Sequence, residues 1–175
     1  LFRRASDCFG RSALMLSGAG SPGAFHLGVV KALAEQDLVP TVISGASAGS
    51  VVAAVVGTHS RDELLEVVSV DGIARRFQAL RTTGPIGRKR ERLRVENLHA
   101  LVEAAIPDMT FGEAYEATGK RINIAVAPAT LHQRSRLLNA STSPNACIRE
   151  AVLASCGAGP GRVRPPAPLD GVSGR

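Results

Sequence analysis

Apolar and polar positions alternate in two distinct ways along the N-terminal part of the chain. Residues 12–17 form a short apolar run that predicts a buried strand, and residues 24–36 place apolar side chains on one face of a helix. A second short strand is expected at residues 41–44, and the helix after it runs to about Gly57. This strand–helix–strand–helix order is typical of a parallel β-sheet that is covered by helices.

The remaining pattern predicts further helices and one strand. Apolar spacing favours helices over residues 61–70, 93–106, 111–118 and 148–156, and alternation favours a strand over residues 121–127. Gly119 is the expected C-cap of the helix over 111–118, because glycine tolerates the left-handed conformation that ends many helices. The whole pattern indicates an α/β fold with a mainly parallel sheet.

Two segments depart from this pattern. Residues 75–94 contain eight Lys or Arg residues against one acid, which predicts a mobile basic loop. The loop is interpreted first as a solvated surface excursion, second as a contact for lipid headgroups, and last as a contact for nucleic acid. Residues 157–175 are dominated by Gly, Pro and Arg without any period, which predicts an irregular tail. We therefore expect one domain over residues 1–156, followed by a tail over 157–175.

The composition argues against several classes of function. The chain has 175 residues, a formal charge of +6 and only 3% aromatic residues, so stacking platforms for single-stranded nucleic acid are not expected and no nucleic-acid partner is inferred. Three cysteines without C-x-x-C spacing argue against a disulfide framework or a zinc site. No signal peptide or transmembrane span is visible, which favours a cytoplasmic or peripheral membrane location. Because the chain opens at Leu1, we expect it to be a fragment.

The first of two glycine-rich turns spans Gly18 to Gly23 and has the form G-x-G-x-x-G. A dinucleotide-binding site would also need an acidic residue at the end of the next strand, where it holds the ribose. Asp37 precedes that strand, and the predicted strand ends at Ser44. The context therefore disfavours a dinucleotide site.

The second turn, from Gly45 to Gly49, has the form G-x-S-x-G with Ser47 at its centre. A serine on a sharp strand-to-helix turn is forced outward, and small neighbours such as Ala46 and Ala48 let the backbone make that bend. The following helix N-terminus favours an oxyanion nearby. The alternative is that the small residues only help the strand and helix to pack. Because the turn lies between a strand and a helix, Ser47 is the strongest candidate nucleophile.

No histidine stands in a recognisable acid–base motif with this serine. The four histidines, His26, His59, His99 and His132, are interpreted as surface or helix-face residues. A Ser–Asp dyad would instead need an aspartate that a later turn brings back to the serine. The Asp71–Gly72 and Asp170–Gly171 pairs are interpreted first as ordinary turns.

These segments together resemble the patatin-like phospholipase family, and more narrowly its triacylglycerol-lipase branch. The resemblance rests on the segments 16–30, 42–50, 111–119, 122–128, 135–139, 143–145 and 154–156, and it covers about Phe9 to Cys156. It implies an α/β/α sandwich with a mainly parallel sheet, incomplete here at the C-terminus. It also implies a lipid acyl hydrolase that uses a Ser–Asp dyad and no metal or organic cofactor.

The resemblance assigns roles to individual residues. Ser47 would attack the ester carbonyl, within the nucleophile elbow that Gly45, Ala46, Ala48 and Gly49 form. Backbone N–H groups of Gly18, Ala19 and Gly20 would stabilise the oxyanion. Ala19 stands where the family usually has glycine, and Pro22 has no N–H to donate.

The tail departs further from the family. After Ser-Cys the family continues with Pro-Gly-Val-Phe-x-Pro and later carries its catalytic aspartate in an Asp-Gly pair, whereas residues 157–166 read GAGPGRVRPP. Codons CCC GGG CGT GTT CGC CCC C would encode Pro160 to Pro165 and begin Pro166, and read one base later they encode Pro-Gly-Val-Phe-Ala-Pro. A frameshift after Cys156 is therefore our hypothesis, and Asp170 is only a tentative base.

The sequence thus favours a serine acyl hydrolase that acts on triacylglycerol or phospholipid esters at a membrane or lipid-droplet surface. The alternative is a truncated, inactive remnant that keeps the nucleophile turn and lacks the catalytic aspartate. A nucleotide-binding module is the third interpretation.

Overall fold

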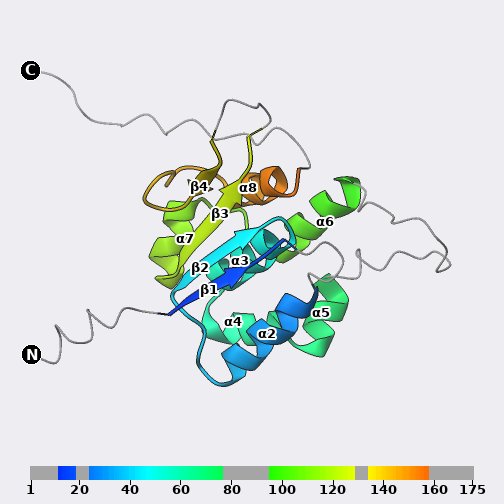
Figure 1. Ribbon diagram of the computed structural model, residues 1–175. Coiled ribbons are helices and arrows are strands. Elements are labelled where there is room, and N and C mark those ends of the chain that lie inside the picture. The colour runs from blue at the N-terminus through cyan, green and yellow to red at the C-terminus, as the bar shows by residue number, and fades with distance from the viewer. Residues whose placement is uncertain (1–11, 19–23, 77–94, 129–133, 158–175) are drawn as a thin grey trace, which may run out of the picture.

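A computed structural model of the chain describes residues 12–18, 24–76, 95–128 and 134–157. Within these ranges a four-stranded sheet has the order β1-β2-β3-β4, with bounds Ala13–Leu16, Val42–Ala46, Arg121–Val126 and Arg136–Leu138. The first three strands are parallel, and β4 is antiparallel to β3. The predicted α/β class with a mainly parallel sheet is confirmed (Figure 1).

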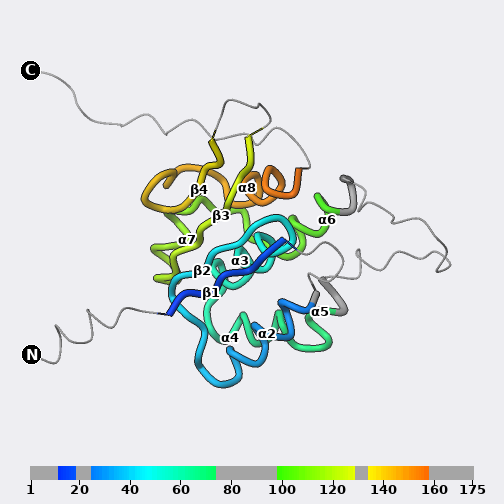
Figure 2. The backbone as a smooth tube through the Cα atoms, in the orientation of Figure 1, coloured from blue at the N-terminus to red at the C-terminus, as the bar shows by residue number. Residues whose placement is uncertain are grey.

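The helices follow the predicted order with small shifts at their ends. They are α2 (Ala24–Glu35), α3 (Ala48–Thr58), α4 (Arg61–Val67), α5 (Val70–Arg76), α6 (Val95–Ala105), α7 (Phe111–Thr118) and α8 (Ile148–Ser155). Helices α2, α4 and α5 follow one another through contacts of α2 with α4 and of α4 with α5, whereas α7 and α8 contact β3 (Figure 2). Gly119 has the predicted left-handed C-cap conformation, with φ 67°.

Helix α3 is the central element of the core. It contacts β1, β2 and β3, and every residue from Gly49 to Thr58 is buried. The sheet presents one apolar face, which includes Leu16, Ile43 and Ile124, all at most 4% exposed. The opposite face is more open, since Met15 on β1 is 81% exposed. The alternation along each strand therefore separates a buried face from an exposed one.

Three expectations for local structure are corrected. Strand β2 extends to Ala46, so Ser44 lies inside the strand and does not end it. The single helix expected over 61–70 is divided, because Ser69 accepts a hydrogen bond from Gly72 N–H and donates one to the Glu66 carbonyl. Asp71 and Gly72 consequently lie in the first turn of α5 and not in an ordinary turn.

Strand β4 was not expected. Its three residues are too few to show an alternating pattern, and it forms by pairing with β3. Residues 77–94 of the predicted basic loop lie outside the described part of the chain. Its first two residues, Arg75 and Arg76, are the last two residues of α5. Residues 158–175 of the predicted tail also lie outside them. In the described part, every helix is too short or too polar to cross a membrane.

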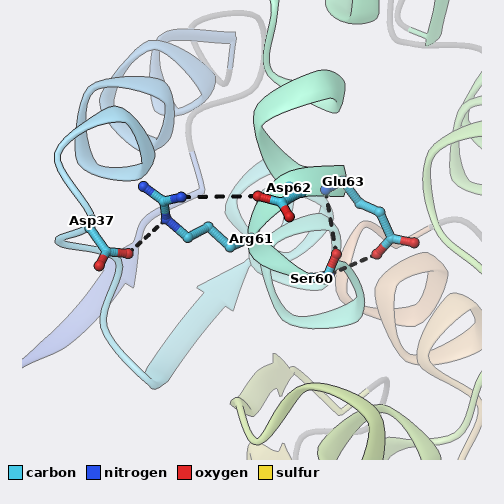
Figure 3. A network of polar contacts seen from close by, with 5 residues as sticks. All are labelled: Asp37, Ser60, Arg61, Asp62 and Glu63. Atoms are coloured by element: carbon cyan, nitrogen blue, oxygen red, sulfur yellow. Dashed lines mark hydrogen bonds and ion pairs between the residues drawn. The ribbon is translucent and has the colours of Figure 1, made fainter.

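The connection from α2 to α4 is stabilised by polar contacts at helix ends (Figure 3). Asp37 follows α2 with a left-handed φ of 56°, and its carboxylate accepts a 2.8 Å hydrogen bond from Arg61 Nε. Ser60 and Glu63 form a capping box at the start of α4, in which the Glu63 carboxylate accepts from the Ser60 N–H at 2.8 Å. These contacts fix where α2 ends and α4 begins.

We predict opposite effects from alanine at two helical glycines. A Cβ at Gly57 would lie 2.1 Å from Cγ1 of the buried Ile122, so Gly57→Ala should destabilise the fold by about 1–3 kcal/mol. Gly28 has open space around the added atom, so Gly28→Ala should stabilise it by about 0.5–1 kcal/mol. Urea unfolding of both variants tests this pair. Equal effects of the two substitutions would contradict the packing of α3 against β3.

We also predict that Glu63 makes stability depend on acid pH. Hydrogen bonds from Ser60 hold the pKa of Glu63 below its usual value of 4.5. Its contribution is therefore complete above pH 4.5 and is lost as the pH falls through the lowered folded-state pKa. Glu63→Gln should flatten the rise in the free energy of unfolding across that range, relative to Glu116→Gln on the exposed face of α7. Identical pH profiles for the two glutamine variants would refute the capping box.

Candidate functional site: the turn at Ser47

Ser47 lies between the end of β2 and the first residue of α3, in a strained backbone conformation. Its φ is 50° and its ψ is −123°, values that only glycine adopts without cost. Such strain costs on the order of 1–3 kcal/mol and persists only where the surrounding structure enforces it. Ser47 occupies the N-cap position of α3, yet its side chain makes no capping hydrogen bond. The hydroxyl is therefore not used to stabilise the helix.

The two glycines of the turn are required by close backbone approach. A Cβ on Gly45 would lie 2.3 Å from the Gly49 carbonyl oxygen, and a Cβ on Gly49 would lie 2.2 Å from the Leu16 carbonyl oxygen. No side chain fits at either position, so the start of α3 can lie directly against the ends of β1 and β2. The small residues therefore serve packing, and this packing is what forms the sharp turn at Ser47.

Gly18, at the start of the first glycine-rich segment, lies beside Ser47. A Cβ on Gly18 would come within 3.2 Å of Ser47 Cβ and 3.9 Å of Ser47 Oγ. His26 on α2 forms a 2.9 Å hydrogen bond with the carbonyl of Ser17, which links α2 to the end of β1. Ala19 and Gly20, the other residues expected to face an oxyanion, lie outside the described residues.

Two further serines hold the backbone of Ser47, and sequence reasoning assigned a role to neither. The Ser47 N–H donates to Ser155 Oγ at 2.9 Å, and Ser155 Oγ donates to the Ala125 carbonyl at 2.7 Å. Ser50 Oγ donates to the Ser47 carbonyl at 2.6 Å. Ser50 follows the G-x-S-x-G pentapeptide directly, which is a signal that could have been used. Ser155 is 108 residues away, and local patterning gives no sign of it.

Cys156 is a third residue near the turn, and the sequence analysis gave it no role in the site. Burial raises the pKa of its thiol, while hydrogen bonds with Ser50 and Ser47 act in the opposite direction. The thiol therefore stays protonated at neutral pH, and a protonated thiol is a poor nucleophile.

The expected base is not among the described residues. Asp170 and His132 lie outside them, and the structure says nothing of either. His59 is buried at the C-terminal end of α3, where Nδ1 forms a 2.8 Å hydrogen bond with the Val55 carbonyl. His99 is exposed on α6. The exposed position of His99 fits the interpretation as a surface residue, whereas His59 is buried just beyond the end of α3.

The structure also bears on the nucleotide and metal alternatives. Asp37 lies beyond the C-terminal end of α2 and contacts Arg61, so it does not occupy the strand-end position that a ribose-binding acid needs. Within residues 12–18, 24–76, 95–128 and 134–157, no three His, Cys, Asp or Glu side chains gather closely enough to hold a metal ion.

Comparison with known proteins gives a family match over most of the chain. Residues 14–173 match the patatin-like phospholipase family. This range contains β1, the turn at Ser47 and α8, and it extends past Cys156, where the sequence resemblance was expected to end.

Curated relatives and a solved structure agree with this match. The chain is 41% identical over 162 residues to Triacylglycerol lipase 4 of Saccharomyces cerevisiae, covering 84% of this chain and 18% of that protein. It is 41% identical over 159 residues to Triacylglycerol lipase SDP1L of Arabidopsis thaliana, covering 85% and 19%. It is 37% identical over 171 residues to Triacylglycerol lipase ptl2 of Schizosaccharomyces pombe, covering 94% and 27%.

Among solved structures, a chain of the SpcU–ExoU complex from the type III secretion system of Pseudomonas aeruginosa has a similar fold. The TM-score is 0.50 at 22% identity, and the match covers 83% of this chain and 38% of that one. At this identity the likeness concerns the fold alone. The chain spans only 18% to 27% of the length of these three curated relatives.

We predict that Cys156 reacts slowly with alkylating reagents while the chain is folded. Because its pKa is raised above 9.0, the pH midpoint of its reaction with iodoacetamide should lie higher in the native chain than in urea. Peptide mass spectrometry resolves Cys156 from Cys147, whose peptide serves as the internal reference. An equal or lower midpoint in the native chain would contradict the buried position of the thiol.

Proposed function

Because the chain belongs to the patatin-like phospholipase family, we propose that it carries the nucleophile of a serine lipid acyl hydrolase. The substrates are carboxylic esters of triacylglycerol or phospholipid, met at a membrane or lipid-droplet surface. The observation that carries the proposal is the conformation of Ser47, held at φ 50° between β2 and α3 with its hydroxyl unused by the helix cap.

In the proposed reaction, Ser47 Oγ attacks the ester carbonyl carbon and transfers its proton to an aspartate carboxylate. Removal of that proton is what makes the hydroxyl an effective nucleophile at neutral pH. The tetrahedral intermediate collapses, the ester C–O bond breaks, and the leaving alcohol takes the proton from the aspartate. Water then attacks the acyl-Ser47 ester, giving a free fatty acid and restoring the hydroxyl.

The oxyanion of the tetrahedral intermediate needs hydrogen-bond donors in place before the reaction. Gly18 is proposed to supply one, since its backbone lies beside the Ser47 side chain. Ala19 and Gly20 are proposed as further donors by resemblance. The N-terminus of α3 adds the positive end of the helix dipole. Loss of a single such donor commonly lowers the rate by about 100-fold or more.

Two exposed apolar side chains support a lipid substrate. Met15 on β1 comes before the glycine-rich segment and is 81% exposed. Phe25, the second residue of α2, comes after that segment and is 76% exposed. Exposed apolar groups on both sides of such a segment suit contact with acyl chains. Relatives that are named triacylglycerol lipases support the same substrate class.

The base is proposed from the family and not from the described residues. The resemblance implies an aspartate in an Asp-Gly pair, for which Asp170 is the tentative candidate. The competing proposal is an inactive remnant, which keeps the elbow at Ser47 without a working dyad.

We predict that a fluorophosphonate probe labels Ser47 in the folded chain. Ser47→Ala should abolish labelling, because phosphonylation needs the activated hydroxyl. Ser141→Ala, in the exposed turn after β4, should label at the wild-type rate. Mass spectrometry of the labelled peptide gives the measurement, and hydrolysis of a short-chain triacylglycerol is followed in parallel. A folded chain that does not label at all would favour the inactive remnant.

A further inference from the structure

We propose that Ser155 is a positioning residue for Ser47, through a hydroxyl relay from the Ser47 N–H to the Ala125 carbonyl. The effect on reactivity rests on the proposed function, whereas the relay itself does not. Two hydrogen bonds form the relay, with distances of 2.9 Å from Ser47 N to Ser155 Oγ and 2.7 Å from Ser155 Oγ to the Ala125 oxygen.

The relay uses one Ser155 hydroxyl in two capacities. A serine hydroxyl donates one hydrogen bond and can accept two. Ser155 accepts from the turn at Ser47 and donates to β3, so both neighbours are satisfied by a single side chain. Ser155 is the last residue of α8, which packs against β3 and α3. A rigid helix end therefore holds this hydroxyl in place.

The relay includes the hydrogen bond of the Ser47 N–H, which helps to fix the strained backbone conformation of Ser47. At a φ of 50° the Ser47 backbone would relax if its peptide groups were free to turn. Ser155 holds the N–H, and Ser50 holds the carbonyl with a 2.6 Å hydrogen bond. Hydrogen bonds thus fix the backbone of Ser47 at both its N–H and its carbonyl.

The relay has a second consequence for the oxyanion. Because the Ser47 N–H is directed to Ser155, it is not available to an oxyanion. The donors must then come from the Gly18 side of the turn and from the first N–H groups of α3. Ser155 in this way selects which backbone groups can stabilise the intermediate, without touching the substrate.

The chain offers a matched control. Ser69 also accepts from a backbone N–H, that of Gly72 at 2.9 Å, and donates to a carbonyl, that of Glu66 at 2.7 Å. It lies between α4 and α5, and these two hydrogen bonds do not involve Ser47. Removing the Ser69 hydroxyl therefore measures how much such a pair of hydrogen bonds contributes to the stability of the fold, separately from any effect on Ser47.

The test compares Ser155→Ala, Ser155→Thr and Ser69→Ala in the full chain. Native-state hydrogen exchange of the Ser47 amide, followed by NMR, should accelerate about tenfold in Ser155→Ala and stay near wild type in the other two. With the fluorophosphonate probe, the rate constant at saturating concentration should fall at least about tenfold in Ser155→Ala, while the half-saturating concentration is unchanged. Threonine should restore the rate, because it keeps the hydroxyl.

Several outcomes would overturn the inference. Unchanged exchange at Ser47 in Ser155→Ala would refute the relay, and an equal labelling defect in Ser69→Ala would reduce Ser155 to a general stabilising role. If wild type does not label, the proposed function fails, and amide exchange still decides the relay. If the alanine variant does not fold, Ser155→Cys replaces it, since a thiol fills similar space but bonds weakly; wild-type exchange and labelling there would refute the relay.

Discussion

The strained backbone at Ser47 is the constraint on which the arrangement around it depends. A φ of 50° is unfavourable for any residue with a side chain, so the fold must supply opposing interactions. The close contacts of Gly45 and Gly49 with backbone carbonyls are one part of these interactions, because they leave the backbone no space to follow another path. Hydrogen bonds to Ser50 and Ser155 supply the other part. Packing and polar contacts thus act on the same residue.

The burial of α3 helps to maintain the strained backbone conformation at Ser47. Ten consecutive residues of α3, Gly49 to Thr58, are buried against the sheet and neighbouring helices, which fixes where its N-terminus can lie. At the other end, Lys120 Nζ donates to the carbonyls of Val56 and His59, at 2.9 and 2.7 Å. Because α3 is held along its length and at both ends, the turn before it has little freedom to move. The position of Ser47 therefore follows from the core as a whole.

Local patterns predicted much of this structure. The order of strands and helices from β1 to α3 follows from apolar spacing, and Ser47 stands out because its glycines are two residues away on either side. The same reasoning failed where structure depends on distant partners. Strand β4 exists by pairing with β3, and the break between α4 and α5 depends on the side chain of Ser69.

The candidate site shows the same division. Gly18 could be expected near Ser47, because the carboxyl ends of adjacent parallel strands meet at one edge of a sheet. The hydrogen bond between Ser47 and Ser155 joins residues 108 positions apart, and no local sequence pattern near either residue predicts it. Its hydroxyl could equally have capped a helix or faced water. Only the packing of α8 against β3 shows which partner it has.

The most direct test of the account is a crystal structure of the chain after reaction with a fluorophosphonate. The account predicts phosphorus bonded to Ser47 Oγ, a phosphoryl oxygen facing the Gly18 N–H, a positive φ at Ser47, and Ser155 within hydrogen-bonding distance of the Ser47 nitrogen. An adduct on another residue, or Ser47 in an ordinary helical or extended conformation, would contradict it.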